Sequence, residues 1–270
     1  MSLVFGAATS DRVNHGAAAS LDPTAAWTYA WWFYFTTLTQ YRTFWRKGIA
    51  GPTNRRACYI DGPSDEIAVE ISRATSDSIY LTNNANLTTN KWWFIAVTFD
   101  ESAGAGEAHN IYLGDLTTLA TERTYGTATD GSGAGDSQAS DDLYVFNGVA
   151  ANAALQGRGA WFGHWNRVLT LGEIQAQQFH PHVESGCVLF THYGYAGTGS
   201  QPDWSGNANA GTVTGATVAD HVPLSPAFGR RGGWRGAFTA AVGGDPEGSL
   251  LGGKLLRGGL LRHGVLVRSA

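Results

Sequence analysis

Residues 27–36 read WTYAWWFYFT and carry the strongest periodic signal in the chain. Side chains on a β-strand point alternately to its two faces. One face of this run would carry Trp27, Tyr29, Trp31, Phe33 and Phe35. The other face would carry Thr28, Ala30, Trp32, Tyr34 and Thr36. Because aromatic residues occupy both faces, we predict a strand that is covered on both sides, as in the middle of a β-sandwich.

Shorter runs of the same kind follow along the chain. They lie at residues 67–73, 78–82, 92–100, 110–113, 143–146, 160–165 and 187–193, with clusters of Gly, Asn and Asp between them. Many strands separated by such turns favour a β-sandwich or jelly roll. The 36 glycines argue against a helical bundle, and the charged fraction of 15% argues against disorder.

One helix is predicted to begin after Thr170. Thr170 is placed as the N-cap and Glu173 follows three residues later, which is the spacing of a capping box. Pro181 disfavours helical geometry at His180, so the helix should end near Phe179. A helix of two to three turns is expected to pack on the surface of the sandwich.

Five segments resemble the laminin-G-like branch of the concanavalin A-like lectin/glucanase superfamily. They are the opening LVFGAATSDRV with the strand after it, KWWFIAVTFD at 91–100, IYLGD at 111–115, the stretch 159–174 ending in RVLTLGEI, and DWSGNAN at 203–209. The resemblance implies an all-β, concanavalin A-like β-sandwich (jelly roll) with one short surface helix over residues 1–226. It says little about a ligand.

The acidic residues do not reproduce the E-x-D-x-x-E strand with which glucanases of this superfamily cleave sugars. Counted from Glu66, the pattern needs acids at positions that hold Ala68 and Ile71. Glu66 and Glu70 share a strand face, which we interpret as a solvated edge. We therefore predict a protein that is not an enzyme.

Metal and cysteine chemistry give weak signals. Asp130, Asp136 and Asp142 are candidate Ca²⁺ ligands, because carboxylates near a sandwich rim suit that ion, but loop acids are usually only solvated. No other cofactor is predicted. Cys58 and Cys187 are interpreted as buried thiols, with one disulfide as the alternative.

Carbohydrate stacking is the main alternative use for the aromatic residues. The chain has 10 Trp, 10 Tyr and 12 Phe, and most of them must fill the core. Trp32, Trp161 and Trp165 are the candidates for a sugar platform. The sequence alone does not tell which aromatic rings face solvent.

Residues 227–270 differ in composition from the body and are predicted to form an extended C-terminal arm. Residues 229–270 have seven basic and two acidic side chains, a formal charge of +5, which leaves −9 on residues 1–228. Nine of the nineteen residues at 250–268 are Leu or Val, more than a solvated linker needs. An arm that contacts neighbouring subunits is favoured over a linker or a nucleic-acid contact. Its candidate contact residues are Trp234, Arg235, Leu255, Leu256, Arg257, Leu260, Leu261 and Arg262.

These features favour a non-enzymatic structural or decoration protein of a virion, such as that of a phage, which binds neighbouring subunits and forms a homo-oligomer. The start of the chain lacks the basic and apolar regions of a secretory signal, so we expect synthesis in the cytoplasm and a place in a virion or extracellular particle. A formal charge of −4 and the lack of a long apolar run give no reason to expect nucleic acid or a membrane as partner. The alternative function is a lectin-like adhesion module that binds a glycan on a phage or cell surface.

Overall fold

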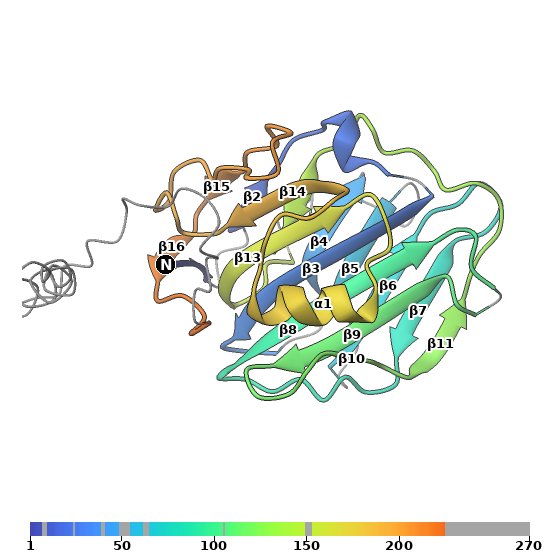
Figure 1. Cartoon of the computed structure of the whole chain (residues 1–270), viewed down its shortest axis with the longest axis horizontal. Coiled ribbons are helices and arrows are strands. Elements are labelled where there is room, and N and C mark those ends of the chain that lie inside the picture. The colour runs from blue at the N-terminus through green and yellow to red at the C-terminus, as the bar shows by residue number, and fades with distance from the viewer. Residues whose placement is uncertain are drawn as a thin grey trace, which may run out of the picture. The chain divides into compact units, whose positions relative to one another are not determined.

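The computed structural model describes residues 1–6, 10–23, 25–38, 41–48, 55–61, 65–104, 106–148 and 153–224. Within them the chain forms two antiparallel sheets packed face to face, with one short helix (Figure 1). The predicted arm at 227–270, with Trp234, Arg235, Leu255, Leu256, Arg257, Leu260, Leu261 and Arg262, lies outside the described residues.

Sheet A contains the strand that the aromatic run predicts. Its strands, in spatial order, are β10 (Thr121–Glu122), β9 (His109–Asp115), β8 (Lys91–Asp100), β3 (Ala26–Phe35), β13 (Gly157–Trp165), β1 (Ser2–Phe5) and β16 (Thr217–Ala219), and β14 (Cys187–His192) also pairs with β13. β3 is central, because it pairs with β8 along its full length and with β13 on its other side.

Sheet B carries the other eight strands. In spatial order they are β11 (Tyr125–Thr129), β7 (Ser78–Thr82), β6 (Glu66–Ile71), β5 (Arg55–Asp61), β4 (Arg42–Gly48), β12 (Leu143–Val145), β2 (Arg12–Asn14) and β15 (Thr212–Thr214). A 3₁₀ turn, η1 (Ala19–Leu21), lies in the connection between β2 and β3.

The two faces of β3 are both buried, as predicted. The odd-numbered aromatic residues join the apolar core between the sheets: Trp27, Tyr29, Trp31, Phe33 and Phe35. Ala30 and Trp32 belong to a second apolar cluster on the outer face of sheet A, and Tyr34 packs against it. The sandwich therefore has a layer of covering structure on this side of sheet A.

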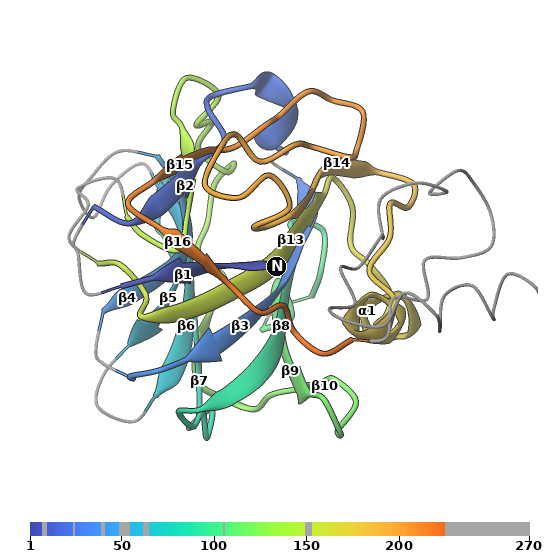
Figure 2. The ribbon, with the colours of Figure 1, turned by 90° about the vertical axis from the view of Figure 1, so that its left-hand side faces the viewer.

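Helix α1 (Leu171–Phe179) is part of that covering layer and confirms the predicted capping box. The Thr170 hydroxyl accepts from the Glu173 amide, and the Glu173 carboxylate accepts from the Thr170 amide. Trp32 Nε1 donates to the Gln178 carbonyl at 2.8 Å, which ties the helix to β3. Figure 2 shows α1 on the side of sheet A that faces away from sheet B.

Two neighbouring arginines lie on opposite faces of β5. Arg56 points between the sheets, where its side chain is 2% exposed and lies 3.0 Å from the Asp22 carboxylate. It also donates to the carbonyls of Pro23 and Asp136. Arg55 points outward and forms an ion pair with Glu70 on β6. β6 lies between β5 and β7 and Glu70 is buried, so the interpretation of Glu66 and Glu70 as a solvated edge was wrong.

Both cysteines are free and buried, which confirms that interpretation over a disulfide. Cys58 lies in the core between the sheets, and Cys187 belongs to the outer cluster on sheet A. Burial raises the pKa of the Cys58 thiol well above its ordinary value, so this thiol is held in its protonated, unreactive form.

Candidate functional site

The outer face of sheet B carries polar side chains, in contrast to the apolar outer face of sheet A. One row of backbone partners crosses the sheet from strand to strand and includes Asn14, Tyr144, Arg46, Ala57 and Glu70. Because partners in a sheet point to the same face, this row places an arginine, a small residue and a carboxylate side by side. The small side chain of Ala57 leaves a depression between its larger neighbours.

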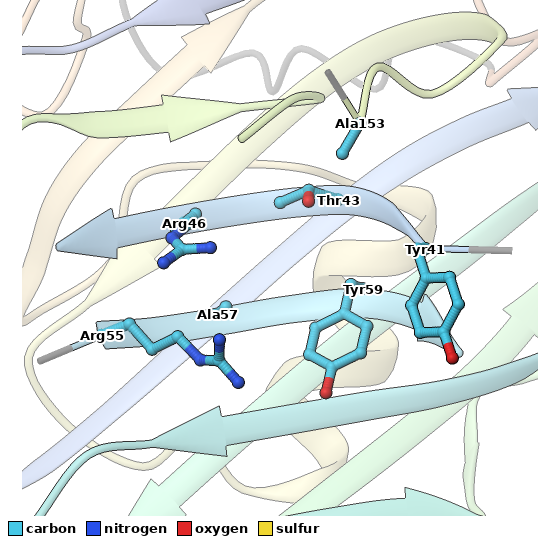
Figure 3. A pocket seen from close by; sticks show the side chains of 7 residues that line it. All are labelled: Tyr41, Thr43, Arg46, Arg55, Ala57, Tyr59 and Ala153. Atoms are coloured by element: carbon cyan, nitrogen blue, oxygen red, sulfur yellow. The ribbon is translucent and has the colours of Figure 1, made fainter. Parts of the chain in front are cut away.

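A hollow of about 300 Å³ lies at this depression, at the lower end of the range for ligand pockets. Its described lining comes from the loop before β4, from β4 and β5, and from the segment before β13: Tyr41, Thr43, Arg46, Arg55, Ala57, Tyr59 and Ala153. Figure 3 shows the two tyrosine rings together at one end and the two arginine side chains at the other. We call these residues the sheet B hollow.

Tyr41 forms the exposed rim of the sheet B hollow. Its side chain is 63% exposed, and its backbone is in the left-handed region with φ of 58°. A bulky residue at positive φ is strained unless the structure around it fixes the geometry. Here the Tyr41 amide donates to the Ile60 carbonyl at 2.8 Å, which holds the Tyr41 backbone beside β5.

Asn147 holds in place the part of the rim that Ala153 forms. Its Oδ1 accepts from the amides of Gly148 and Ala153, and its Nδ2 donates to the Asp11 carbonyl. Ala153 in turn accepts from the Thr43 amide at 3.0 Å. The buried Asn147 side chain therefore joins Gly148 to Ala153, and Ala153 is bonded in turn to β4.

Glu70, on the same outer face, orients two of the lining side chains from beside Ala57. It pairs with the Arg55 guanidinium and accepts a hydrogen bond from the Tyr59 hydroxyl at 3.2 Å. Burial and the neighbouring Glu70 charge both raise the pKa of Tyr59, so this hydroxyl stays a donor. Burial and the nearby Arg55 charge lower the pKa of Arg46, although a guanidinium remains charged at neutral pH. The hollow thus presents aromatic rings, hydroxyls and two fixed cations.

The three tryptophans predicted as sugar platforms are buried, and that prediction is corrected. Trp32, Trp161 and Trp165 are each 0% exposed. They belong to the outer cluster of sheet A, where Phe94 and Phe190 contact Trp161 and the Gln178 carbonyl accepts from Trp32. Their rings pack under α1 and against Phe190 on the same face of sheet A, so they offer no face to a sugar.

The carboxylates of two candidate calcium ligands, Asp130 and Asp142, accept hydrogen bonds within the fold, and the backbone of Asp136 is bonded as well. Asp130 accepts from the Tyr80 hydroxyl and from backbone amides, and Asp142 accepts from Asn14 and Tyr144. The Asp136 amide and carbonyl bond to Ser72 and Arg56. Within the described residues, no three His, Cys, Asp or Glu side chains gather as ligands of one ion.

Ser78 and His109 form a contact that could be mistaken for a catalytic pair. Ser78 Oγ lies 2.8 Å from His109 Nε2, and the Asp130 charge acts on His109. Both side chains are 0% exposed between the sheets. Ser78 Oγ donates its proton to the Thr129 carbonyl, so it accepts from the histidine and is not activated by it. This contact stabilises the core.

Sequence reasoning missed the residues of the sheet B hollow. The predicted strands omitted β4 and β5, because basic residues interrupt the apolar alternation in RTFWRKG and RRACYID. A signal is present nevertheless. The outward positions of β5 carry Arg55, Ala57 and Tyr59, a basic, a small and an aromatic residue in alternation.

In the described part of the chain, no helix is long and apolar enough to cross a membrane.

Comparison with solved structures shows the same fold at low identity. A "putative carbohydrate binding protein" from Bacteroides ovatus superposes with a TM-score of 0.52 and 16% identity, over 82% of this chain and 59% of that chain. The chain thus spans about three fifths of the length of that protein. A heptameric SAP-like pentraxin from Limulus polyphemus gives a TM-score of 0.42 and 9% identity, over 66% of this chain and 81% of the pentraxin.

Tailspike protein 2 of an Escherichia coli O157:H7 bacteriophage gives a TM-score of 0.38 and 15% identity, over 62% of this chain and 26% of the tailspike. Comparison with curated proteins gives no match. The family model described as concanavalin A-like lectin/glucanases superfamily matches residues 7–175, which is more than half of the chain. Together with the two-sheet architecture, this match confirms the resemblance: the chain belongs to the concanavalin A-like lectin/glucanase superfamily.

Proposed function

We propose that this chain binds carbohydrate in the sheet B hollow. The observation that carries the proposal is the position of Tyr41 and Tyr59 beside hydrogen-bonding side chains in a concave, solvent-facing site (Figure 3). Pockets that bind small molecules combine apolar or aromatic surface with a few placed polar groups, and this hollow has both. The Bacteroides ovatus protein that shares the fold is described as a "putative carbohydrate binding protein", and we choose carbohydrate as the class of ligand for that reason.

Two side chains of the hollow and the backbone of a third residue are held before any ligand arrives. Glu70 holds Arg55 and Tyr59, and the Ile60 carbonyl holds the backbone of Tyr41. Side chains that are already ordered lose little further conformational freedom on binding. A preorganised site of this kind suits a weakly bound, polar ligand such as a sugar.

We propose binding without cleavage. Retaining and inverting glycosidases need two carboxyl groups on either side of the scissile bond. Glu70 is neutralised by Arg55, and the position two residues before it on the same face is Ala68. Release of reducing sugar from a bound glycan, lost in Glu70→Gln, would contradict this part of the proposal.

A glycan array probed with the full chain tests binding itself. We expect at least one class of glycan to bind and Tyr59→Ala to weaken it by about tenfold, since the loss of one aromatic contact and one hydrogen bond is worth about 1.5 kcal/mol. Tyr195→Ala is the matched control, because Tyr195 is 46% exposed and lies outside the hollow. If Tyr195→Ala removes binding and Tyr59→Ala does not, the hollow is the wrong site.

We also propose that residues 227–270 link this module to other subunits, as in a virion or another extracellular particle. The supporting observation is the change in sequence after residue 226, where a basic, Leu-rich segment follows an acidic body. Deletion of 227–270 should leave a folded protein that sediments as a smaller species than the full chain. Equal sedimentation of the two species, corrected for mass, would contradict a role in assembly.

A further inference from the structure

We infer that Tyr41 selects the ligand of the sheet B hollow by stacking its exposed ring on the apolar face of a sugar. The inference rests on the proposed function and assigns the recognition of the sugar ring to one residue. The feature that carries it is a mismatch at Tyr41 between a strained backbone and an exposed side chain.

Seven residues other than glycine have a positive φ within the described part of the chain. Residues with a short polar side chain adopt this left-handed conformation at low cost, because the side chain can bond to the nearby backbone. Four of the seven are of that kind and a fifth is alanine: Asp65, Asn84, Asn86, Asn90 and Ala208. Only Tyr41 and Phe146 carry a bulky side chain, for which the conformation is unfavourable.

Packing explains the conformation of Phe146. Its ring is 0% exposed in the core between the sheets, and its centroid lies 4.9 Å from that of Phe5 and 5.0 Å from that of Phe33. The burial of an aromatic ring offsets the strain of its backbone. Tyr41 gains little from burial, because its side chain, at 63%, is the most exposed of the large apolar side chains that the structure describes.

The fold requires the backbone conformation of residue 41 but does not require a tyrosine there. β4 begins at the next residue, Arg42, whose partner on β5 is Ile60, and the Tyr41 amide donates to the Ile60 carbonyl at 2.8 Å. These contacts use main-chain atoms only, so glycine or asparagine would make them with less strain. Strain that the fold itself does not need is a feature of ligand-binding positions.

The surroundings of the Tyr41 ring fit that role. Tyr41 lies beside Tyr59 at one end of the hollow (Figure 3), and the Tyr59 hydroxyl is held by Glu70. An aromatic ring exposed in a concave site can contact the C–H groups on one face of a sugar and release water from both surfaces. Most of the surface of the Tyr41 side chain is open to such a contact.

Tyr41→Asn separates recognition from stability, because the two should change in opposite directions. The probes are hexasaccharides of β-1,4-linked glucose, xylose, mannose and galactose, which present different hydroxyl groups on their ring faces. We expect at least one of them to bind the full chain in titration calorimetry, and Tyr41→Asn to weaken the tightest by at least about tenfold. The same variant should raise the melting temperature by about 2–4 °C, because the backbone strain is relieved.

Tyr41→Phe keeps the ring and should restore the affinity to within about threefold of the wild type. Tyr195→Asn is the matched control, because it removes a ring that is 46% exposed at a position without positive φ. It should neither weaken binding nor raise the melting temperature.

Two results would overturn the inference and leave the proposed function intact. One is binding that survives Tyr41→Asn to within about threefold but is lost in Tyr59→Ala. The other is a melting temperature that falls in Tyr41→Asn, since the ring would then serve the fold. If none of the four hexasaccharides and no glycan on the array binds, the proposed function fails and the role of Tyr41 fails with it.

Discussion

The outer face of sheet A is covered, whereas the outer face of sheet B carries a hollow that faces solvent. On sheet A, Trp32, Phe94 and Trp161 are covered by α1 and by the segments around β14, and they form a second apolar core. On sheet B, the equivalent face carries Arg46, Tyr59 and Glu70 around a hollow that faces solvent. We propose that the sandwich uses one outer face for stability and the other for recognition. A substitution should affect folding on the first face and binding on the second.

The largest difference in stability between the two faces is expected for a tryptophan substitution on sheet A and a tyrosine substitution on sheet B. Trp32→Ala removes a fully buried ring and its hydrogen bond to Gln178, and should lower the free energy of unfolding by about 3–5 kcal/mol. Tyr59→Ala on sheet B should cost about 1 kcal/mol and act mainly on glycan affinity. Urea unfolding of both variants measures the difference. Equal losses of stability would mean that the two faces are buried alike.

The neighbouring arginines of β5 test the same contrast within one strand. Arg56→Gln leaves the buried Asp22 carboxylate without its cation and should destabilise the fold by about 3–5 kcal/mol. Arg55→Gln, one residue away, should cost less, about 1–2 kcal/mol, because Arg55 lies on the outer face and the Tyr59 hydroxyl still donates to the Glu70 carboxylate. Thermal unfolding of the two variants checks this ordering. A larger loss in Arg55→Gln would contradict the assignment of their faces.

Acid should weaken the fold before it weakens binding. Burial lowers the pKa of His15 and His192 to about 4 and that of His109 to about 3, below the ordinary value of 6.5. Between pH 6.5 and 4 the unfolded chain therefore binds more protons than the folded chain, and stability falls as pH falls, by up to about 3 kcal/mol per histidine. No histidine is among the described residues of the hollow, so affinity for a neutral glycan should change little from pH 8 to 6.

Melting temperatures from pH 8 to 4 measure this loss. His15→Gln should flatten part of the profile, because Gln does not titrate. A melting temperature that stays constant down to pH 4 would contradict the burial of neutral histidines.

The smallest effect is expected at the cap of α1. Thr170→Ala removes the hydroxyl that accepts from the Glu173 amide and should cost about 1 kcal/mol. Because α1 covers sheet A, glycan binding on sheet B should be unchanged. Thr127→Ala on the exposed edge strand β11 is the control and should be neutral within about 0.5 kcal/mol. Circular dichroism during thermal unfolding resolves the two variants.

The sequence alone was sufficient for the central strand and the helix. Strict alternation of aromatic residues in β3 and the spacing of Thr170 and Glu173 are local patterns, and local patterns survive folding when the whole structure agrees with them. The superfamily was also recognisable from five segments, most of which lie on strands of the two sheets.

The proposed binding face could not be predicted from the sequence, for two reasons. Alternation shows that Trp32 faces away from Trp31, but it does not show that α1 will cover Trp32. In β4 and β5, Lys47 and Arg56 point into the core, so a basic residue at an inward position hides the strand pattern. Which aromatic rings reach solvent depends on contacts between segments far apart in the chain.

Hydrogen exchange of the full chain, with and without a bound glycan, shows which face of the sandwich a ligand covers. We predict that the ligand protects backbone amides in residues 41–46 and 55–59 on sheet B and leaves those of α1 unchanged. Protection of α1, or of residues 194–205 around Tyr195 and Trp204, without protection of β4 and β5 would contradict it.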